Sequence, residues 1–440
     1  MVSLKLSVSL LLALPDKEWA NLWQGDVWDA TTVREWGDVS RGAQKTNRTI
    51  HLGRLFGIMV QKGSELSHLP DSDPMKKNMK FKYRVVFQGN NVVDQNWEVA
   101  LFQDLGSSPA TMEAGKAVDC HGCAPGHDVE QADAVQAYIQ APLSGTETWV
   151  HLPVEAWPAE WHGKYTRPVV LIKKALYGHP DSGTYSGKHC DTALRAGGYK
   201  PVINCPSCYY HSDLQLMLVA YVDDFKLSGP KKNLAKGWDL IMRDSKGNER
   251  LKIETPAPAN LYLGCTHEVK TISHADGHQS RAMVYNMESY LTSTVEKYCD
   301  LVENLTGDKV ILKQVATPFL IEDNKDAAAG RPATSGGMPI CPWCKIPCVK
   351  PTGTTSGVSG KDERHHAAGA PSKPGKKKKV VAKAKSEKEE LPNRGALQPI
   401  AASILMKILY AARMARFDLL RATCRLACYI TKWTEECDKR

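Results

Sequence analysis

Two adjacent aspartates, Asp223 and Asp224, end a Tyr-Val-Asp-Asp tetrapeptide that follows the apolar run 214–220. The apolar pattern resumes at 225–227 before a Ser-Gly-Pro stop, which predicts a hairpin with both carboxylates near its tip. Neighbouring side chains on a strand point to opposite faces, so only a turn lets both approach one ion. Mg²⁺ is typically bound by one or two such carboxylates. The pattern predicts metal-assisted phosphoryl transfer, and an ordinary Asp-rich surface turn is the alternative.

A two-metal site requires a further carboxylate that can help hold two ions about 3.5–4 Å apart. The candidate is Asp133, which lies in the segment 131–140 and precedes the apolar residues 137–139.

Three blocks follow one another along the chain, at 133–140, at 171–178 (Leu-Ile-Lys-Lys-Ala-Leu-Tyr-Gly) and at 221–224. In this order they resemble the reverse transcriptase of Ty1/copia retrotransposons. That family carries an Asp-Val-Lys-Thr-Ala-Phe-Leu-Asn-like block, a Leu-Lys-Lys-Ser-Leu-Tyr-Gly block and Tyr-Val-Asp-Asp. Shorter segments also resemble parts of the family's fingers, palm, thumb and connection, at 82–89, 149–153, 261–264, 316–318 and 397–433. The resemblance covers roughly residues 75–320 and 397–435.

The resemblance implies an RNA-directed DNA polymerase that transfers nucleotides to a primer 3′-hydroxyl with two Mg²⁺ or Mn²⁺ ions. It implies that Asp133, Asp223 and Asp224 are the catalytic residues and metal ligands. Its partners would be an RNA or DNA template with primer, deoxynucleotide triphosphates, and other Pol domains such as integrase and ribonuclease H. An intracellular location, in cytoplasm or nucleus and without a membrane, is expected.

The nucleotide-binding residues implied by the resemblance are Lys82, Arg84 and Tyr138. The two basic side chains would bind the triphosphate, since they stabilise phosphate charge. Tyr138 would lie under the sugar and exclude a ribose 2′-hydroxyl. The alternative interpretations are a solvated strand face for Lys82 and Arg84, and core packing for Tyr138.

One segment departs from the family pattern. After Leu-Tyr-Gly the family continues Leu-Lys-Gln-Ala-Pro-Arg-x-Trp, whereas this chain has His-Pro-Asp-Ser-Gly-Thr-Tyr at 179–185. The Gln that helps to seat template and nucleotide is missing, and Asp181, near its place, would disfavour a phosphate. Two functions therefore stay open, an active polymerase and a catalytically inactive retroelement remnant that binds nucleic acid.

Composition indicates a globular chain with a basic surface. The 440 residues are 42% hydrophobic, and 57 Lys and Arg against 48 Asp and Glu give a net charge of +9. Moderate basicity favours a phosphate-backbone partner, because neutralised phosphates release counterions. Strand-like and helical runs alternate, which together with the resemblance predicts an α+β right-hand polymerase with fingers, palm and thumb. A small antiparallel palm sheet would be backed by helices.

We expect five regions along the chain. A poorly defined N-terminal segment at 1–60 precedes fingers and palm at 61–275 and a thumb-like helical region at 276–322. A disordered Gly/Pro/Lys-rich insert at 323–395 comes next, because it lacks hydrophobic periodicity. A helical connection at 396–440 would lead toward a missing ribonuclease H domain, with Asp418 as the N-cap of the helix 419–430.

Three features have competing interpretations. Residues 5–15 imitate a signal peptide without a clear cleavage site, so a helix or an abrupt gene start is the preferred reading. The Lys run 376–379 is either a nuclear-localisation or nucleic-acid tail, or part of a low-complexity insert. Thirteen cysteines include three Cys-x-x-Cys pairs, and an odd total argues against a closed disulfide framework. The best zinc candidates are Cys341, Cys344, Cys348 and His365 or His366, and incidental cysteines are the alternative.

Overall fold

The computed structural model describes residues 2–62, 80–102, 109–312 and 394–439. They form an α+β protein with several sheets and two compact units. Unit 1 comprises 1–297 with 413–416, and unit 2 comprises 298–412 with 417–440. Most of the insert expected at 323–395, including the candidate zinc ligands and the Lys run, lies outside the described residues. Within the described ranges, no helix has the length and apolarity that crossing a membrane requires.

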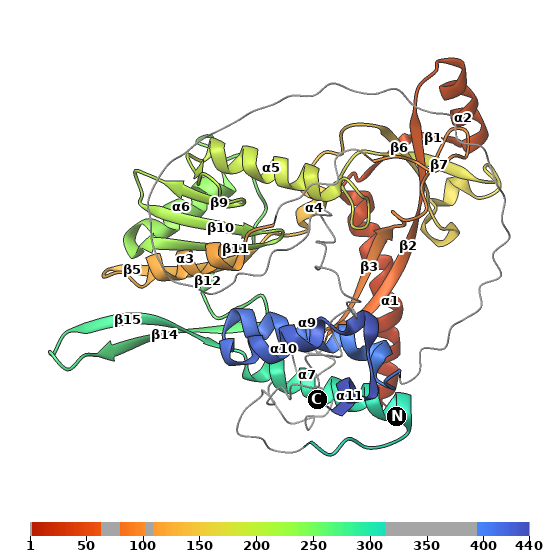
Figure 1. Cartoon of the computed structure of the whole chain (residues 1–440). Helices are drawn as coiled ribbons and strands as arrows, with labels where there is room; N and C mark the ends of the chain where they lie inside the picture. Colours follow the sequence, from red (N-terminus) through yellow and green to blue (C-terminus); the bar gives the residue numbers. More distant parts are fainter. Residues whose placement is uncertain (1, 63–79, 103–108, 313–393, 440) are drawn as a thin grey trace, which may run out of the picture. The chain divides into compact units, whose positions relative to one another are not determined.

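The first sheet of unit 1 has the strand order β1-β7-β6-β2-β3, with β4 paired to β2 (Figure 1). Strands β2 and β6 run parallel and the other pairs are antiparallel. Its strands are β1 (Trp28–Glu35), β2 (Ile50–Lys62), β3 (Lys80–Phe87), β4 (Val93–Asp94), β6 (Glu147–His151) and β7 (Pro168–Ile172). Helices α1 (Val2–Gln24) and α2 (Trp36–Lys45) belong to the same part of the chain. The boundary expected at residue 60 falls inside β2.

The N-terminal segment is therefore an integral part of this sheet. Trp19 and Trp28 are buried with Val85, Val150 and other residues from the later strands in one apolar core. These partners lie up to 144 residues further on (172 − 28), because Trp28 pairs with Ile172. The packing explains why a segment with little periodicity of its own is ordered.

The second sheet has the order β12-β5-β11-β10-β9-β8, and every pair in it is antiparallel. Its strands are β5 (His127–Asp133), β8 (Lys200–Pro201), β9 (Cys208–His211), β10 (Leu216–Tyr221), β11 (Asp224–Pro230) and β12 (Ala257–Pro258). One face packs on α5 (Ser182–Ala196) and α6 (Lys231–Met242) through a core that includes Leu194, Leu218 and Trp238. The other face contacts α3 (Met112–Gly122) through Val118 and Val219. The expected antiparallel sheet backed by helices is thus present.

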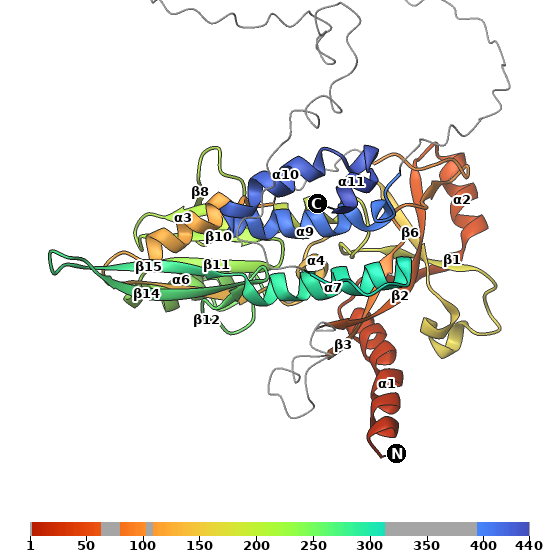
Figure 2. The same ribbon diagram turned by 60° about the horizontal axis from the view of Figure 1, so that its bottom comes forward.

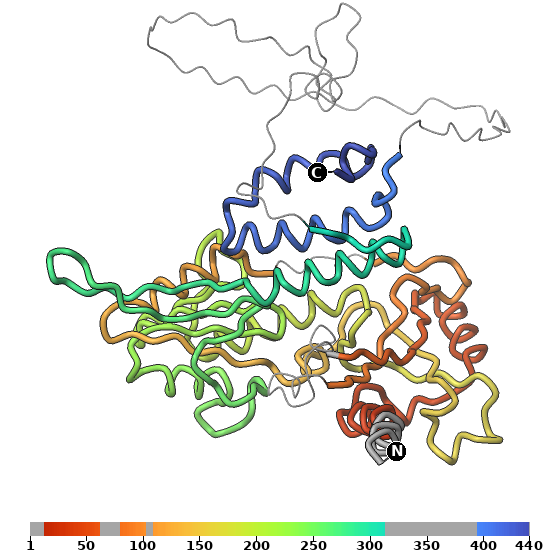
Figure 3. Tube along the Cα trace, turned by 90° about the horizontal axis from the view of Figure 1, so that it is seen from below, coloured from red at the N-terminus to blue at the C-terminus, as the bar shows by residue number. Residues whose placement is uncertain are grey.

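The third sheet is a long hairpin with one short additional strand (Figure 2). Strands β14 (Cys265–Ser273) and β15 (Gln279–Asn286) pair over their full length, and β13 (Leu261–Tyr262) pairs with the start of β14. The hairpin tip lies beyond the second sheet in the Cα trace (Figure 3). Between β13 and β14, Leu263 and Gly264 have φ of 49° and 77° and form a turn.

The remaining elements are short connections or helices. Unit 1 also contains α4 (Ala137–Gln140) and the 3₁₀ turns η3 (Val154–Ala156) and η4 (Ala159–Trp161). Helix α7 (Glu288–Thr306) lies in the region 276–322 that was expected to be helical, although residues 279–286 of that region form β15, and it runs from unit 1 into unit 2. The C-terminal helical elements are α9 (Gln398–Met414), η5 (Phe417–Leu419), α10 (Leu420–Ala427), η6 (Ile430–Lys432) and α11 (Glu435–Lys439).

Unit 2 is held together by a small apolar cluster and one carboxylate. Ala401, Leu405, Trp433 and Cys437 form the cluster. The Asp438 carboxylate accepts hydrogen bonds from the Ala396 and Leu397 N–H groups and from Trp433 Nε1. It satisfies donors just before α9 that would otherwise lack intrahelical partners. The expected N-cap at Asp418 was wrong, because α10 begins at Leu420 and its N-cap position is Leu419.

Candidate functional site

The carboxylates of the Tyr-Val-Asp-Asp segment lie at a two-residue hairpin turn between β10 and β11. Tyr221 pairs with Asp224, which leaves Val222 and Asp223 as the loop. On the next strand, Asp133 lies directly opposite Asp224 in the β5–β11 register. Directly opposed residues of an antiparallel pair project from the same face of the sheet. The fold thus brings together two carboxylates that are 91 residues apart in sequence (224 − 133).

The backbone of Asp223 is tied to the same strand. Its carbonyl oxygen accepts a hydrogen bond of 2.6 Å from the Ala134 N–H group, one residue beyond Asp133. Its side-chain charge acts on two tyrosines: burial raises the pKa of Tyr138 and of Tyr177, and the nearby Asp223 carboxylate raises both further. Asp223 therefore links the carboxylate pair to an aromatic pair.

The sequence predicts that Asp133, Asp223 and Asp224 bind a divalent cation. Within the described ranges, no group of three or more His, Cys, Asp or Glu side chains is placed to hold a metal ion. The register supplies a facing pair, Asp133 and Asp224, and one or two carboxylates are what Mg²⁺ commonly takes from a protein. Binding of a divalent cation by this pair, or by all three aspartates, therefore stays a prediction.

The turn itself is strained. Val222 has φ of 59° and an exposed side chain. Positive φ at the first central residue of a two-residue hairpin usually requires glycine, and a β-branched residue there is an outlier. Such strain persists only where the surrounding structure over-determines the backbone, and it clusters at functional sites. The hairpin pairing and the Ala134–Asp223 hydrogen bond supply that constraint.

Replacing Val222 by Gly is expected to raise the free energy of unfolding by about 0.5–1 kcal/mol. The relieved strain, about 1–2 kcal/mol, outweighs the extra backbone entropy that glycine loses on folding. Urea unfolding followed by circular dichroism measures the change.

The matched control for this turn is Gln215→Gly. Gln215 has φ of 54° just before the same strand β10 but is not β-branched, so its gain should be smaller. A Val222→Gly protein that is less stable than the parent would contradict strain at this turn.

Arg84 and two tyrosines form a stacked cluster beside the turn. The Arg84 guanidinium lies 4.9 Å from the centroid of the Tyr177 ring. The Tyr138 and Tyr177 rings meet edge to face with centroids 4.6 Å apart. Arg84 comes from β3 and Tyr177 from the loop after β7, while Tyr138 comes from α4, which follows β5 of the second sheet. Tyr138, which was expected to bind nucleotide, thus lies near Asp223, and Arg84 is joined to it through Tyr177.

Lys82 is exposed on β3 two residues from Arg84 and therefore on the same side of the strand. Both basic side chains also act on Glu18 of α1. Burial raises the pKa of Glu18, and the positive charges of Lys82 and Arg84 oppose that shift. This strand face is therefore a basic surface with one acidic neighbour.

The blocks at 82–89 and 171–178 meet at their C-terminal ends. The Phe87 N–H group donates a 2.7 Å hydrogen bond to the Tyr177 carbonyl. Gly178 has φ of 87°, and a Cβ on it would lie 2.1 Å from the Phe87 carbonyl oxygen. Glycine is required there for both reasons, which explains the Leu-Tyr-Gly sequence physically.

The segment that departs from the family pattern starts with a buried core histidine. His179 packs against Phe87 and Phe102, with ring centroids 4.8 and 5.5 Å apart. Its Nδ1 accepts a hydrogen bond from the Asp181 N–H group, so the neutral ring carries its proton on Nε2. Nε2 is buried and has no hydrogen-bond partner among the described residues. Burial lowers the pKa of His179 to about 4.

The protein is expected to lose stability in acid through His179. The folded-state pKa lies below the unfolded value of 6.5, so protons bind the unfolded chain more tightly. The stabilisation is complete above pH 6.5 and is lost as the pH falls through about 4. The shift corresponds to about 3 kcal/mol. Urea unfolding at pH 7, 5.5 and 4 measures it.

His179→Leu should flatten this pH dependence. The exposed His162 is the control, and His162→Leu should leave the slope unchanged. Burial also lowers the pKa of His51, so part of the slope should persist in the His179 variant. An unchanged slope in His179→Leu would show that this ring does not titrate as its burial requires.

The three Cys-x-x-Cys pairs differ in whether the structure describes them. Cys341, Cys344, Cys348 and His365 lie outside the described residues, so their zinc site stays a prediction. Cys120 and Cys123 lie at the end of α3 and are free thiols. Cys205 lies just before β9 and Cys208 begins it, and both are also free thiols. Burial raises the pKa of Cys123 and raises that of Cys208 to about 12, which disfavours the thiolate that binds metals.

Comparison with protein-family models found no match for this chain. Comparison with curated proteins found none either. The functional interpretation therefore depends on the arrangement of the residues described above.

Two features were missed by sequence analysis. Tyr177 is the ring that joins Arg84 to Tyr138, and its place in a recognised block was the available signal. Lys226 is fully buried on β11 although it looked like part of an apolar strand pattern. A lysine between Phe225 and Leu227 was the signal, but its partners could not be read from the sequence.

Proposed function

We propose that this chain is the RNA-directed DNA polymerase domain of a copia-like retroelement, adding deoxynucleotides to a primer 3′-hydroxyl. The observation that carries the proposal is the β5–β11 register, which sets Asp133 opposite Asp224 at a strained two-residue turn. The same three sequence blocks that resemble the family converge on this turn. That convergence is more specific than any one block.

In this proposal the second sheet is the palm and the first sheet belongs to the fingers. The region 276–322, whose described part contains β15 and helix α7, would act as a thumb. Primer and template would be held mainly through their backbones, as reading any sequence requires. The net charge of +9 favours such a partner.

The roles of the site residues follow from their chemistry. Asp133 and Asp224 would bind Mg²⁺, which when bound would make the 3′-hydroxyl more acidic and offset phosphate charge. Arg84, held over the Tyr177 ring, would bind the triphosphate as a preoriented cation, with the exposed Lys82 beside it. The Asp223 carboxylate would be a further ligand of the ions, as the resemblance implies, and its backbone bond to Ala134 would orient the turn.

Tyr138 would discriminate between sugars. Its ring is held against Tyr177 and near Asp223, so it cannot easily move aside for a 2′-hydroxyl. In Tyr138→Ala, incorporation of ribonucleotides relative to deoxynucleotides should rise about 10- to 100-fold in kcat/KM. Tyr210→Ala, at an exposed tyrosine of β9, is the control and should not change the ratio.

The test of the proposal is primer extension by the full chain. A labelled DNA primer on an RNA template is incubated with Mg²⁺ and one nucleotide at a time, beside Asp223→Asn. We expect extension by the nucleotide complementary to the template and a marked loss in the variant.

Binding without extension would instead support the alternative of an inactive nucleic-acid-binding remnant. That outcome requires a protein folded by circular dichroism, tested with both Mg²⁺ and Mn²⁺, with primer-template binding measured by fluorescence anisotropy. A folded protein that neither binds nor extends would overturn both functions.

A further inference from the structure

A lysine is buried beside the carboxylate pair. Lys226 lies on β11 two residues after Asp224, so both side chains project from the same face of the sheet, about 7 Å apart along the strand. Its Nζ atom lies 3.0 Å from both carboxylate oxygens of Asp119 on α3. Both side chains are 1% exposed. This ion pair is separate from the residues that would touch a nucleotide.

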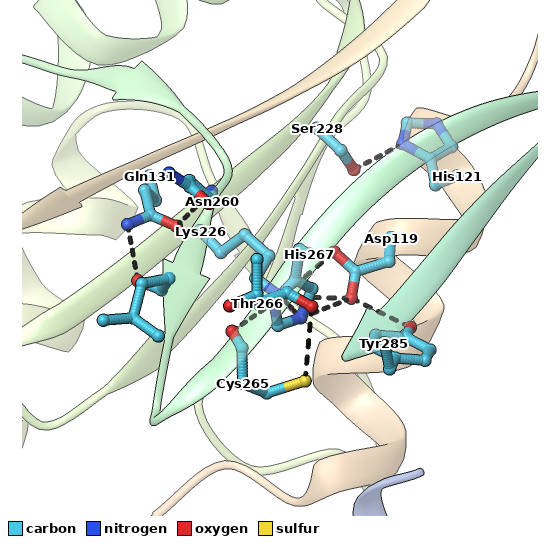
Figure 4. Close-up of polar contacts among 11 residues, drawn as sticks. Asp119, His121, Gln131, Lys226, Ser228, Asn260, Cys265, Thr266, His267 and Tyr285 are labelled. Atoms are coloured by element: carbon cyan, nitrogen blue, oxygen red, sulfur yellow. Dashed lines mark hydrogen bonds and ion pairs between the residues drawn. The ribbon is translucent and has the colours of Figure 1, made fainter. Parts of the chain in front are cut away.

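The ion pair is the centre of a network that joins separate elements (Figure 4). Lys226 Nζ also lies 3.1 Å from His267 Nε2 on β14, and the Tyr285 hydroxyl on β15 donates to Asp119 at 3.0 Å. The ammonium sits 4.0 Å from the centroid of the Tyr262 ring on β13. The network therefore fastens β11 to α3 and to all three strands of the third sheet.

The orientation of His267 is itself fixed. His267 Nδ1 lies 2.9 Å from the Cys265 carbonyl oxygen, which can only accept, so Nδ1 carries a proton. In the neutral ring, Nε2 is then free to accept from the Lys226 ammonium. Nε2 also lies 3.4 Å from Asp119 Oδ2, to which a protonated His267 ring would donate instead.

Hydrogen bonds of Gln131 on β5, the strand opposite Lys226, add a second constraint. Gln131 faces Lys226 in the β5–β11 register. Its side chain donates to the Leu261 carbonyl at 2.9 Å and accepts from the Asn260 N–H group at 3.1 Å. Side-chain hydrogen bonds from both β5 and β11 therefore fix the Gln131–Lys226 pair, which lies two residues from the Asp133–Asp224 pair.

Burying the Lys226–Asp119 ion pair costs free energy of desolvation, and packing alone does not require two charges at this place. Burial lowers the pKa of Lys226, and the Asp119 carboxylate opposes that shift. A well-packed apolar pair is often as stable as a buried ion pair, so a buried pair is weak evidence for stability but can specify one conformation. Directed hydrogen bonds fix the strand in a way that apolar contacts do not.

The strained turn at Val222 requires that the strand after it be held in place. Val222 holds a backbone conformation that β-branched residues avoid, and strain of this kind relaxes unless its surroundings resist. The network is anchored four residues after Val222 on the strand that the turn enters. We propose that Lys226 is a positioning residue whose ion pair with Asp119 fixes β11 against α3 and the third sheet, and so holds the Asp224 carboxylate opposite Asp133. The proposal rests on the proposed polymerase function.

The test uses the full chain with Lys226→Met/Asp119→Asn, which removes both charges and leaves Tyr285 an acceptor. Single-nucleotide extension gives kcat and KM, and hydrogen exchange of the amides at 221–228 reports on the strand without needing activity. We expect kcat to fall at least about tenfold with KM for the nucleotide unchanged. Exchange at 223–226 should quicken by a similar factor.

The matched control is Ser228→Ala, on the same strand and face. Ser228 is fully buried and bonds to His121 Nδ1 at 3.0 Å, but it takes no part in the Lys226 network. We expect kcat in this variant within twofold of the parent. Parent-like kcat and exchange in the double variant, or an equal loss in Ser228→Ala, would overturn the proposal.

The two proposals can fail separately. If the parent protein does not extend primers, the polymerase function fails, and hydrogen exchange still decides whether Lys226 fixes the strand. Unchanged exchange at 221–228 overturns the positioning role in that case too.

Discussion

Asp224→Asn is expected to abolish nucleotide addition, by about 10³-fold or more in kcat, while the protein stays folded. The amide keeps the shape of the side chain but lacks the charge that would bind a cation. Asp133 would then face a neutral partner across the β5–β11 pair. The same substitution should make the cation-free protein more stable by about 0.5 kcal/mol, because like charges directly opposite each other on neighbouring strands repel.

This combination of lost activity and gained stability distinguishes a metal site from a structural carboxylate. Melting temperature is measured with and without Mg²⁺, since a ligand that binds the folded state raises it. The parent should be stabilised by Mg²⁺ and Asp224→Asn should not.

Asp213→Asn is the control for Asp224→Asn. Asp213 is exposed in the turn at the other end of β10, so its loss should change neither activity nor the response to Mg²⁺. An Asp224→Asn protein with parental activity would remove the carboxylate pair from the chemistry.

The hairpin that carries Asp223 and Asp224 could be predicted because its signals are local. Apolar runs of strand length stand on both sides of it, and its end is marked by Ser-Gly-Pro. The pairing of Asp224 with Asp133 could be inferred only through the family resemblance. Strand register between distant segments depends on which faces are buried, which one strand alone does not reveal.

The roles of other residues could not be predicted from sequence, because they depend on partners that are distant along the chain. Lys226 is paired with Asp119, 107 residues earlier, and with His267, 41 residues later. His179 looked like a defect in a substrate-binding segment, yet its ring fills a core between Phe87 and Phe102. In both cases tertiary packing decides what the residue type does, so local pattern could not assign it.

The N-terminal segment illustrates the same limit at the level of domains. Trp28 is buried because β1 pairs with β7, whose sequence comes more than a hundred residues later. Sequence periodicity reports on one element at a time and therefore left 1–60 undefined. Hydrophobic content indicated burial but could not name the partner strand.

Lys226→Met is expected to lower the free energy of unfolding by about 3–5 kcal/mol, the second large effect that the structure predicts. Methionine fills most of the volume of the lysine stem, so the loss comes from Asp119, whose carboxylate would stay buried without its cation. Adding Asp119→Asn should recover much of the loss, because the double variant buries no charge. The coupling energy between the two sites should therefore be well above 1 kcal/mol.

Urea unfolding of the parent, both single variants and the double variant measures this cycle. Lys231→Met is the matched control, since Lys231 begins the helix after β11 and pairs with Asp128 at 3.8 Å while 81% exposed. An exposed pair of this kind contributes less than about 1 kcal/mol. If Lys226→Met costs no more than Lys231→Met, the Asp119 carboxylate must be solvated, protonated or paired with His267, whose Nε2 lies 3.4 Å away, and the Lys226 ion pair cannot be what fastens β11 to α3. A large single-variant loss that Asp119→Asn reverses would show that the charge, rather than the packing of the lysine stem, carries the effect.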